Sequence, residues 1–353
     1  DSSPSRGLGD VYKRQFYTDA HLSHQPPEII GRGKPIPHWE IASRADSLLS
    51  ALKAGGHSVE APESVGLAPI AAVHDPGYLT FLETAWQRWQ DLPNAPDAVQ
   101  ANAYPVRHMT GKPTDIVGLA GYYMATNSAP IVEGTWAAAL GAVDTAVAAA
   151  RAVLDGDGAS YALCRPPGHH AYGDLAGGVC YLNNVAIAAC EMLQELPRVA
   201  ILDVDVHHGN GTQGIFYNRR DVFFCSLHGN PAEYFPFFAG YAHEHGEGEG
   251  LGFNLNLPQA FGTGDEDYLS SLDQGLDAIR RFAPDALLVS LGFDAYADDP
   301  IGFLTISTEG FGRIGEAIAR MGLPTVLVQE GGYNVADLGK NLTSFLKGFE
   351  GAR

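Results

Sequence analysis

Cysteine is scarce in this sequence and forms no recognisable framework. The 353 residues include 4 cysteines, all in apolar stretches and none in CxxC spacing (Cys164, Cys180, Cys190 and Cys225). Disulfide-rich secreted domains and thiolate metal sites use more cysteines at closer spacing. We therefore expect buried free thiols and a reducing, cytoplasmic location.

Positive charge is also in short supply. Lys and Arg number 22 against 41 Asp and Glu, which gives a formal net charge of -19. Such a protein repels nucleic acid and anionic lipid and attracts small cations. We expect no nucleic-acid partner and a cationic amine as ligand. The sequence also offers no run that we interpret as a signal peptide or a membrane span, so no membrane partner is expected.

The first 15 residues, which end in "RGLGDVYKRQ", are polar and without periodicity. They resemble a leader translated from adaptor sequence, so we expect residues 1–15 to be non-native and the folded domain to span residues 16–353. An ordinary N-terminal tail is the alternative.

Short apolar runs alternate with helical patterns along the rest of the chain. Helices are predicted over residues 134–156, 266–282 and 307–321, the last beginning at the cap Ser307. This alternation predicts a single α/β domain with a doubly wound, mostly parallel sheet and helices on both faces. The predicted strands are Phe16–Thr18, Tyr161–Cys164, Val199–Val206, Val222–Leu227, Phe253–Leu257, Ala286–Leu291 and Val326–Gln329.

Residues 91–115 interrupt the alternation. The segment contains four prolines and no periodicity, which predicts a long loop inserted in the domain. A lid or dimer contact and a mobile surface insertion remain equal alternatives.

Polar side chains follow several of the predicted strands. Open parallel sheets bind ligands beyond the carboxyl ends of their strands, so these groups should meet at one rim. The stretches that follow the strands are "RPPGHHA", "DVDVHHGN", "SLHG", "GFDAYADDP" and "EGGYN".

Asp205 and His207 are two residues apart at the end of a predicted strand and should share a face. With Asp294 from another strand they could bind one metal ion and leave a coordination position open, as catalytic sites do. Nitrogen and oxygen ligands suit Zn²⁺, although Fe²⁺ is an alternative. Taken singly, each residue is better explained as a cap, a surface carboxylate or a core histidine.

His169 and His170 are adjacent, and neighbouring buried imidazoles resist being charged together, so their pKa values should separate. Asp203 and Asn210 are the groups available to orient them. Tyr333 follows two glycines and could donate a hydrogen bond to an oxyanion, or it could be an ordinary rim tyrosine.

Together, "CRPPGHHA", "LDVDVHHGNGTQ", "SLHG", "LGFDAYADDP" and "EGGYN" resemble the histone deacetylase superfamily, which shares its fold with arginase. The resemblance runs in order from about Phe16 to about Gly348. The stretches "HDPGYLTFLETAWQRW", "PTDIVGLAGYYM" and "HGNPAEYFPFFAGYA" are similar to bacterial acetylpolyamine amidohydrolases.

The resemblance implies a zinc ion on Asp205, His207 and Asp294. It implies that His170, oriented by Asn210, is general base and then acid, and that Tyr333 polarises the carbonyl. His169, oriented by Asp203, would assist electrostatically. The implied structural K⁺ site comprises Asp203, Asp205, His207, Ser226 and Leu227, and a second such site Phe216, Arg219 and Val222.

The resemblance also implies that the loop at 91–115 makes a homodimer, and that Phe235 lines a narrow substrate tunnel near Gly178. Two positions depart from the family. Val179 replaces an aromatic residue opposite Phe235, which predicts a wider tunnel and longer acyl groups. Val117 stands where an acidic residue could meet a distal ammonium. The run "HEHGEGEG", residues 243–250, adds acid near the expected rim, although a solvated loop explains it better.

The leading hypothesis is zinc-dependent hydrolysis of N-acyl amines, with acetylpolyamines first and acyl-lysine side chains second. Arginase-type hydrolysis expects two metals in an aspartate-rich cluster, which the paired histidines and the tyrosine disfavour. A non-catalytic acyl-amine-binding module is the alternative from another class.

Overall fold

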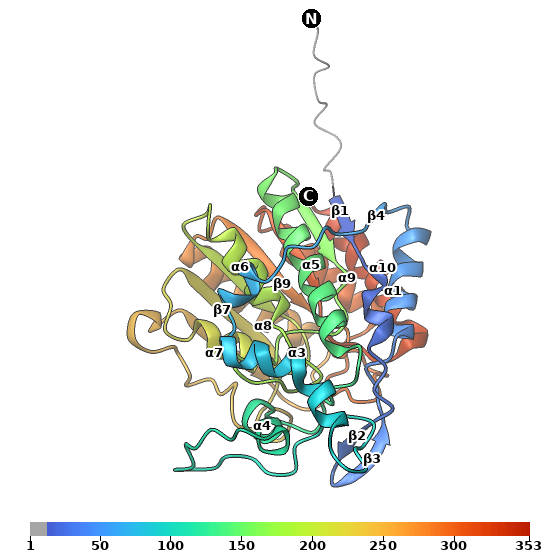
Figure 1. Cartoon of the computed structure of the whole chain (residues 1–353). Coiled ribbons are helices and arrows are strands. Elements are labelled where there is room, and N and C mark those ends of the chain that lie inside the picture. The colour runs from blue at the N-terminus through green and yellow to red at the C-terminus, as the bar shows by residue number, and fades with distance from the viewer. Residues whose placement is uncertain (1–12) are drawn as a thin grey trace, which may run out of the picture.

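The computed structural model describes residues 13–353, whose largest element is an eight-stranded sheet in the order β4-β1-β5-β10-β9-β6-β7-β8 (Figure 1). Every neighbouring pair in this sheet is parallel, so the predicted α/β class is confirmed. Its strands are β1 (Lys13–Phe16), β4 (Val59–Glu60), β5 (Ala159–Ala162), β6 (Val199–Asp203), β7 (Val222–Gly229), β8 (Asn254–Gln259), β9 (Ala286–Leu291) and β10 (Thr325–Gln329).

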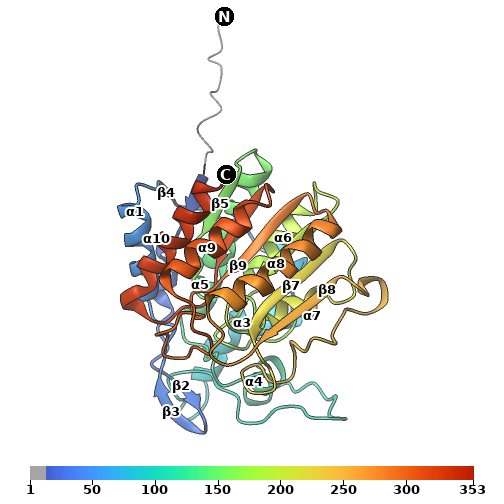
Figure 2. The same cartoon turned by 180° about the vertical axis from the view of Figure 1, so that it is seen from behind.

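Helices cover both faces of the sheet, as predicted. One apolar cluster joins α5, α6 and α7 to one face, and another joins α1, α8, α9 and α10 to the other (Figures 1 and 2). The helices are α1 (Ser43–Ala54), α2 (Ala68–Ala71), α3 (Pro76–Gln90), α4 (Ile116–Tyr123), α5 (Thr135–Leu154), α6 (Asn184–Met192), α7 (Asn210–Phe216), α8 (Asp265–Phe282), α9 (Thr308–Ala319) and α10 (Val335–Gly351), with short 3-10 helices at Asp19–Ser23 and Gly248–Gly250.

The central strands are mostly apolar because both of their faces are covered. All residues of β5, β6, β7, β9 and β10 are buried. Parallel strands enclosed in this way lack the alternation of half-exposed strands. The predicted cap of α9 is also present, since Ser307 Oγ accepts a hydrogen bond from Gly310 N at 2.9 Å.

One helix has a property that was not expected from the sequence: α5 is long and apolar enough, by length and composition, to cross a membrane. Its most apolar window is 67% buried inside the protein. The helix is rich in alanine and packs against β5 and α6, which explains its low polarity without a bilayer.

Several elements were not predicted, among them a small hairpin. β2 (Glu28–Gly31) and β3 (Lys34–Pro37) form an antiparallel hairpin outside the main sheet. Their prolines and charges hide the alternation that identifies a strand. The hairpin, α4 and the loop at 91–115 all project from the same end of the molecule (Figures 1 and 2).

The expected domain start at residue 16 falls inside β1. Lys13, Arg14 and Gln15 pair with β5 in the parallel register, and Gln15 is buried. These three residues therefore belong to the sheet, while residues 1–12 of the expected leader lie outside the described residues. The described chain has no helix or strand between α3 and α4, in agreement with the predicted loop.

Candidate active site

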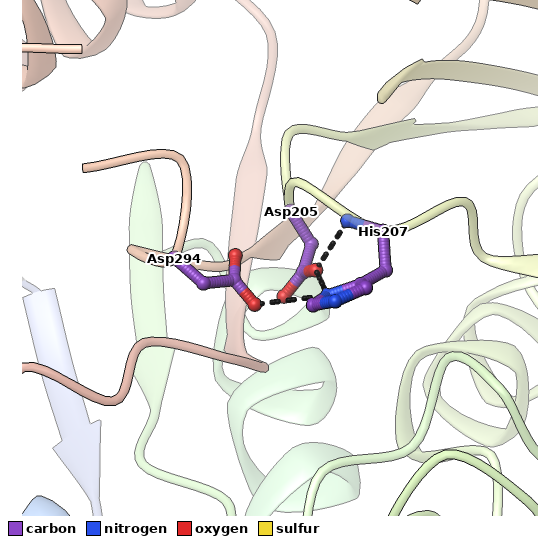
Figure 3. Close-up of side chains that lie close together, drawn as sticks. All are labelled: Asp205, His207 and Asp294. Carbon is purple, nitrogen blue, oxygen red and sulfur yellow. Dashed lines mark hydrogen bonds and ion pairs between the residues drawn. The ribbon is translucent and has the colours of Figure 1, made fainter. Parts of the chain in front are cut away.

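Two carboxylates and an imidazole meet beyond the carboxyl ends of β6 and β9 (Figure 3). His207 Nδ1 lies 3.2 Å from Asp205 Oδ1 and 3.1 Å from Asp294 Oδ2. One ligand atom from each residue lies within 4.8 Å of the others, and all three residues are buried. The structure therefore brings together the three residues that the sequence suggested as metal ligands.

The sequence predicted that strand alternation would bring these side chains together, but the structure shows a different cause. β6 ends at Asp203, three residues earlier than predicted. Beyond it, Asp203 Oδ1 accepts from Asp205 N at 3.1 Å, and Asp205 Oδ1 accepts from His207 N at 2.9 Å. Aspartate side chains that bond the backbone two residues on make tight local turns. These successive turns direct Asp205 and His207 toward Asp294.

A glycine lets the loop after β10 approach the cluster. Gly331 N donates to Asp205 Oδ2 at 2.8 Å. A Cβ atom at this position would lie 2.1 Å from Asp294 Oδ2, so any other residue would displace the carboxylate. Gly331 is therefore needed for close approach.

The donor set fits a divalent cation. Asp203, Asp205 and Asp294 are each fully buried within one small region, and buried carboxylates are stable only when paired or bound to a cation. Asp205, His207 and Asp294 supply two oxygens and one nitrogen, with no thiolate among them. Such ligands suit zinc and leave room for a water and a substrate oxygen.

The paired histidines have different partners. His169 Nδ1 lies 2.9 Å from Asp203 Oδ2, and His170 Nδ1 lies 2.6 Å from Asn210 Oδ1. The two ring centroids are 4.1 Å apart. These are the hydrogen bonds expected from the sequence.

The pKa values of the pair separate, as expected. Burial lowers the pKa of His169, but the carboxylates of Asp203 and Asp205 outweigh burial and raise it well above the ordinary value. Burial and the charge of His169 lower the pKa of His170. His169 is therefore charged and His170 neutral near pH 7.

Glu330 is a site residue that was given no role from the sequence, although it lies in the quoted "EGGYN". Its Oε2 accepts from Gly168 N at 2.7 Å and from His169 N at 3.1 Å, and the side chain is fully buried. It thus fixes the turn that carries both histidines. A glutamate directly after an apolar strand was the available signal.

A pocket of about 390 Å³ leads to this cluster. Tyr234 stacks on His207 with ring centroids 4.9 Å apart, and the Phe235 ring lies 5.1 Å from that of His170. The pocket is lined by Gly31, Arg32, Trp39, Ser128, His170, Gly178, Val179, His207, Glu233, Tyr234, Phe235, Phe237, Ile301 and Tyr333.

Three of the four predicted tunnel residues, Gly178, Val179 and Phe235, line this pocket. Val117 does not: it lies in α4 and packs against a separate apolar cluster around α3, outside the described lining. The hairpin β2–β3 supplies Gly31 and Arg32 instead, and neither was expected because the hairpin itself was not predicted.

The acidic run at 243–250 contributes no residue to the described pocket lining. Glu244 Oε2 accepts hydrogen bonds from Gln213 Nε2 at 2.7 Å and from Gly240 N at 2.9 Å, so this carboxylate joins the loop at 240–244 to α7. Glu247 N donates to Tyr217 O, which precedes β7. This agrees with the preferred interpretation of the run as a loop: residues 247–250 lie near the amino ends of β7 and β8 rather than at the expected rim.

The residues expected at the two monovalent-cation sites lie on β6, β7 and the segments that adjoin them. Asp203 pairs with Ser226 across β6 and β7, and Leu227 follows directly. Phe216, Arg219 and Val222 lie on the connection from α7 to β7. Occupation of either group by K⁺ stays a prediction.

Known proteins are similar to this chain in sequence and in structure. Residues 38–349 match the Histone deacetylase domain family. The chain is 47% identical over 339 residues to an acetylpolyamine amidohydrolase of Burkholderia pseudomallei, covering 96% of this chain and 98% of that protein. It is 45% identical over 341 residues to acetylpolyamine amidohydrolase 1 of Pseudomonas aeruginosa, covering 95% and 98%.

A solved structure extends the likeness to three dimensions. The crystal structure of an acetylpolyamine aminohydrolase from Burkholderia pseudomallei matches with a TM-score of 0.95 at 45% identity, covering 97% of this chain and 100% of that one.

Proposed function

This chain belongs to the histone deacetylase domain family, and we propose that it hydrolyses the amide bond of N-acetylated amines, acetylpolyamines first, releasing acetate and the free amine. One observation carries the proposal. The pocket reaches His207, one of the three candidate metal ligands, and is also lined by His170 and Tyr333, so a base and a hydrogen-bond donor lie beside one candidate metal site.

The metal that fits this donor set is zinc, with Fe²⁺ as the alternative. Asp205, His207 and Asp294 would hold such an ion, which would supply Lewis-acid chemistry by polarising the amide carbonyl and lowering the pKa of the attacking water. K⁺ at Asp203, Asp205, His207, Ser226 and Leu227 would have a structural role.

His170 is suited to act as general base. Asn210 Oδ1 can only accept, so the His170 Nδ1 atom that lies 2.6 Å from it carries the proton. The Nε2 atom then has a free lone pair and can take a proton from the attacking water. The same atom returns the proton to the departing amine. Asn210 holds the tautomer that this exchange requires.

His169 and Tyr333 stabilise the charges that develop. His169 stays protonated beside Asp203 and places a positive charge next to the reacting atoms. The phenol pKa of Tyr333 is raised far above 10, mainly by burial, so its hydroxyl remains a donor and can hydrogen-bond the carbonyl oxygen as negative charge forms.

Substrate selection is the finer part of the proposal. The net charge of -19 favours a cationic amine. The acyl-lysine alternative uses the same chemistry. The loop at 91–115 carries the exposed Val106 and Met109, which supports the proposed homodimer through this loop. All four cysteines are free, which supports a cytoplasmic location.

The test is a substrate panel. We would measure kcat/KM of metal-replete protein for acetylputrescine, acetylspermidine and an acetyl-lysine peptide, with and without a chelator. The proposal expects chelator-sensitive turnover that is fastest on the acetylpolyamines. If the peptide is the better substrate, the acyl-lysine alternative is favoured. Protein that binds acetylpolyamines but hydrolyses none of the three is a binding module.

A further inference from the structure

We infer that Asp299 is a positioning residue that holds Tyr333 in place for the reaction, an inference that rests on the function proposed above. Asp299 lies in the "DDP" stretch after Asp294 and has no part in the chemistry described so far. Its carboxylate connects two segments that both line the pocket, one containing Ile301 and the other Tyr333.

The contacts of this carboxylate are specific. Oδ2 accepts from Tyr333 N at 2.7 Å and from Asn334 N at 3.1 Å, and Oδ1 accepts from Ile301 N at 3.1 Å. The Tyr333 amide, which directly precedes the phenol side chain, is thus held by Asp299. A carboxylate that accepts several backbone N–H groups makes strong, charge-assisted hydrogen bonds.

The rest of the loop explains why this tie matters. Arg44 holds the preceding carbonyls, with Nε donating to Gly332 O at 2.5 Å and Nη2 to Glu330 O at 2.7 Å. Gly332 has a φ of +118°, a backbone conformation that glycine adopts more readily than other residues, so the backbone can rotate at this position. The Gly332 carbonyl and the Tyr333 N–H belong to one peptide plane, which Arg44 holds at the oxygen and Asp299 holds at the N–H. Asp299 also holds the next amide, that of Asn334, so it supplies the hydrogen bonds to the chain on both sides of the Tyr333 Cα.

Asp299 also helps to position the opposite wall of the pocket, through its hydrogen bond to Ile301 N. Ile301 O accepts a hydrogen bond from the Tyr234 hydroxyl, and Tyr234 stacks on His207. The Asp299 carboxylate thus connects two parts of the pocket. One is Tyr333, whose phenol would donate to the substrate, and the other is Tyr234, which packs on His207. Displacement of a reacting group by about 1 Å can lower a rate on the order of 100-fold.

The test is a double-mutant cycle on the metal-replete enzyme. Asp299→Asn keeps the shape but replaces one accepting oxygen with a donor, and Asp298→Asn is the matched control because that neighbouring side chain is exposed. We expect Asp299→Asn to lower kcat by about 10- to 100-fold, with KM within about twofold and metal content unchanged. Asp298→Asn should match the wild type.

The decisive comparison uses Tyr333→Phe. If Asp299 acts through the phenol, adding Asp299→Asn to Tyr333→Phe should lower kcat by less than about twofold. An equal loss in both backgrounds, a loss of metal in Asp299→Asn, or a fully active Tyr333→Phe would overturn the inference. Asp299→Glu, which keeps the charge, replaces Asp299→Asn if the latter does not fold, and should show the same kcat-selective loss. Failure of the proposed function itself is distinct, because it would leave wild-type protein inactive on every acyl amide.

Discussion

Replacing Asn210 with aspartate should convert His170 from a neutral base into a charged imidazole. The structure contains its own reference, because His169 makes the equivalent Nδ1 hydrogen bond to a carboxylate, Asp203, at 2.9 Å. That pairing raises the pKa of His169, whereas burial and the charge of His169 lower the pKa of His170, whose partner is a neutral amide. An opposite charge within hydrogen-bonding distance typically raises the pKa of a histidine by about 1 to 3 units.

The expected result is a displaced pH–rate profile. A general base must be deprotonated, so activity falls below its pKa and each pH unit below that point lowers kcat/KM by about tenfold. Asn210→Asp should therefore move the acid limb upward by about 1 to 3 pH units and recover activity at alkaline pH. Asn210→Ala is the control, since it removes the orienting acceptor without adding charge and should lower activity without an upward shift.

The assay is kcat/KM for an acetylated fluorogenic amine between about pH 5 and 10, a range that spans the ordinary pKa of histidine, with metal content measured in each variant. An acid limb at the same pH in wild type and Asn210→Asp would refute the assignment of His170 as the base. A limb that moves downward would contradict the electrostatic reasoning.

Three further predictions concern the pocket and the fold. Val179 lines the pocket, so propionyl and butyryl amides should rival acetyl amides in kcat/KM, and a steep decline with acyl length would show that the tunnel is not widened. Glu233 and Arg32 are the charged residues other than histidine among the described lining. Glu233→Gln should therefore raise KM for acetylspermidine but not for a neutral acetyl-lysine amide, and Arg32→Gln should lower KM for acetylspermidine alone. Equal effects on KM for both substrates would contradict this prediction. Burial lowers the pKa of His74 from 6.5 to about 4, and its Nε2 accepts from Asn183 N, so the unfolded state binds the extra proton between these pH values. Its contribution to the free energy of unfolding is complete above pH 6.5 and falls by up to ~1.4 kcal/mol per pH unit toward pH 4, so urea unfolding should show a shallower acid loss in His74→Gln.

The central sheet and the metal ligands could be predicted from sequence for physical reasons. Buried parallel strands are continuously apolar, and β9 coincides with the predicted Ala286–Leu291. Asp205, His207 and Asp294 stand shortly after such strands, where the topology of an open sheet brings side chains together.

What escaped prediction depends on irregular backbone. The turns after Asp203 and the β2–β3 hairpin have no hydrophobic period, so Arg32 could not be placed at the pocket. Val117 was expected at the tunnel from an aligned position, whereas within this chain it lies in α4 against an apolar cluster, outside the described lining. The function of Asp299 follows from hydrogen bonds to distant amides, which sequence spacing does not reveal.

The most direct test of the site is the metal content of three purified proteins, measured by elemental analysis after equal loading with zinc. We expect about one zinc per chain in wild type and in an inactive His170→Ala variant, and almost none in Asp205→Ala. Equal zinc in all three proteins, or loss of zinc in His170→Ala, would contradict a metal site formed by Asp205, His207 and Asp294.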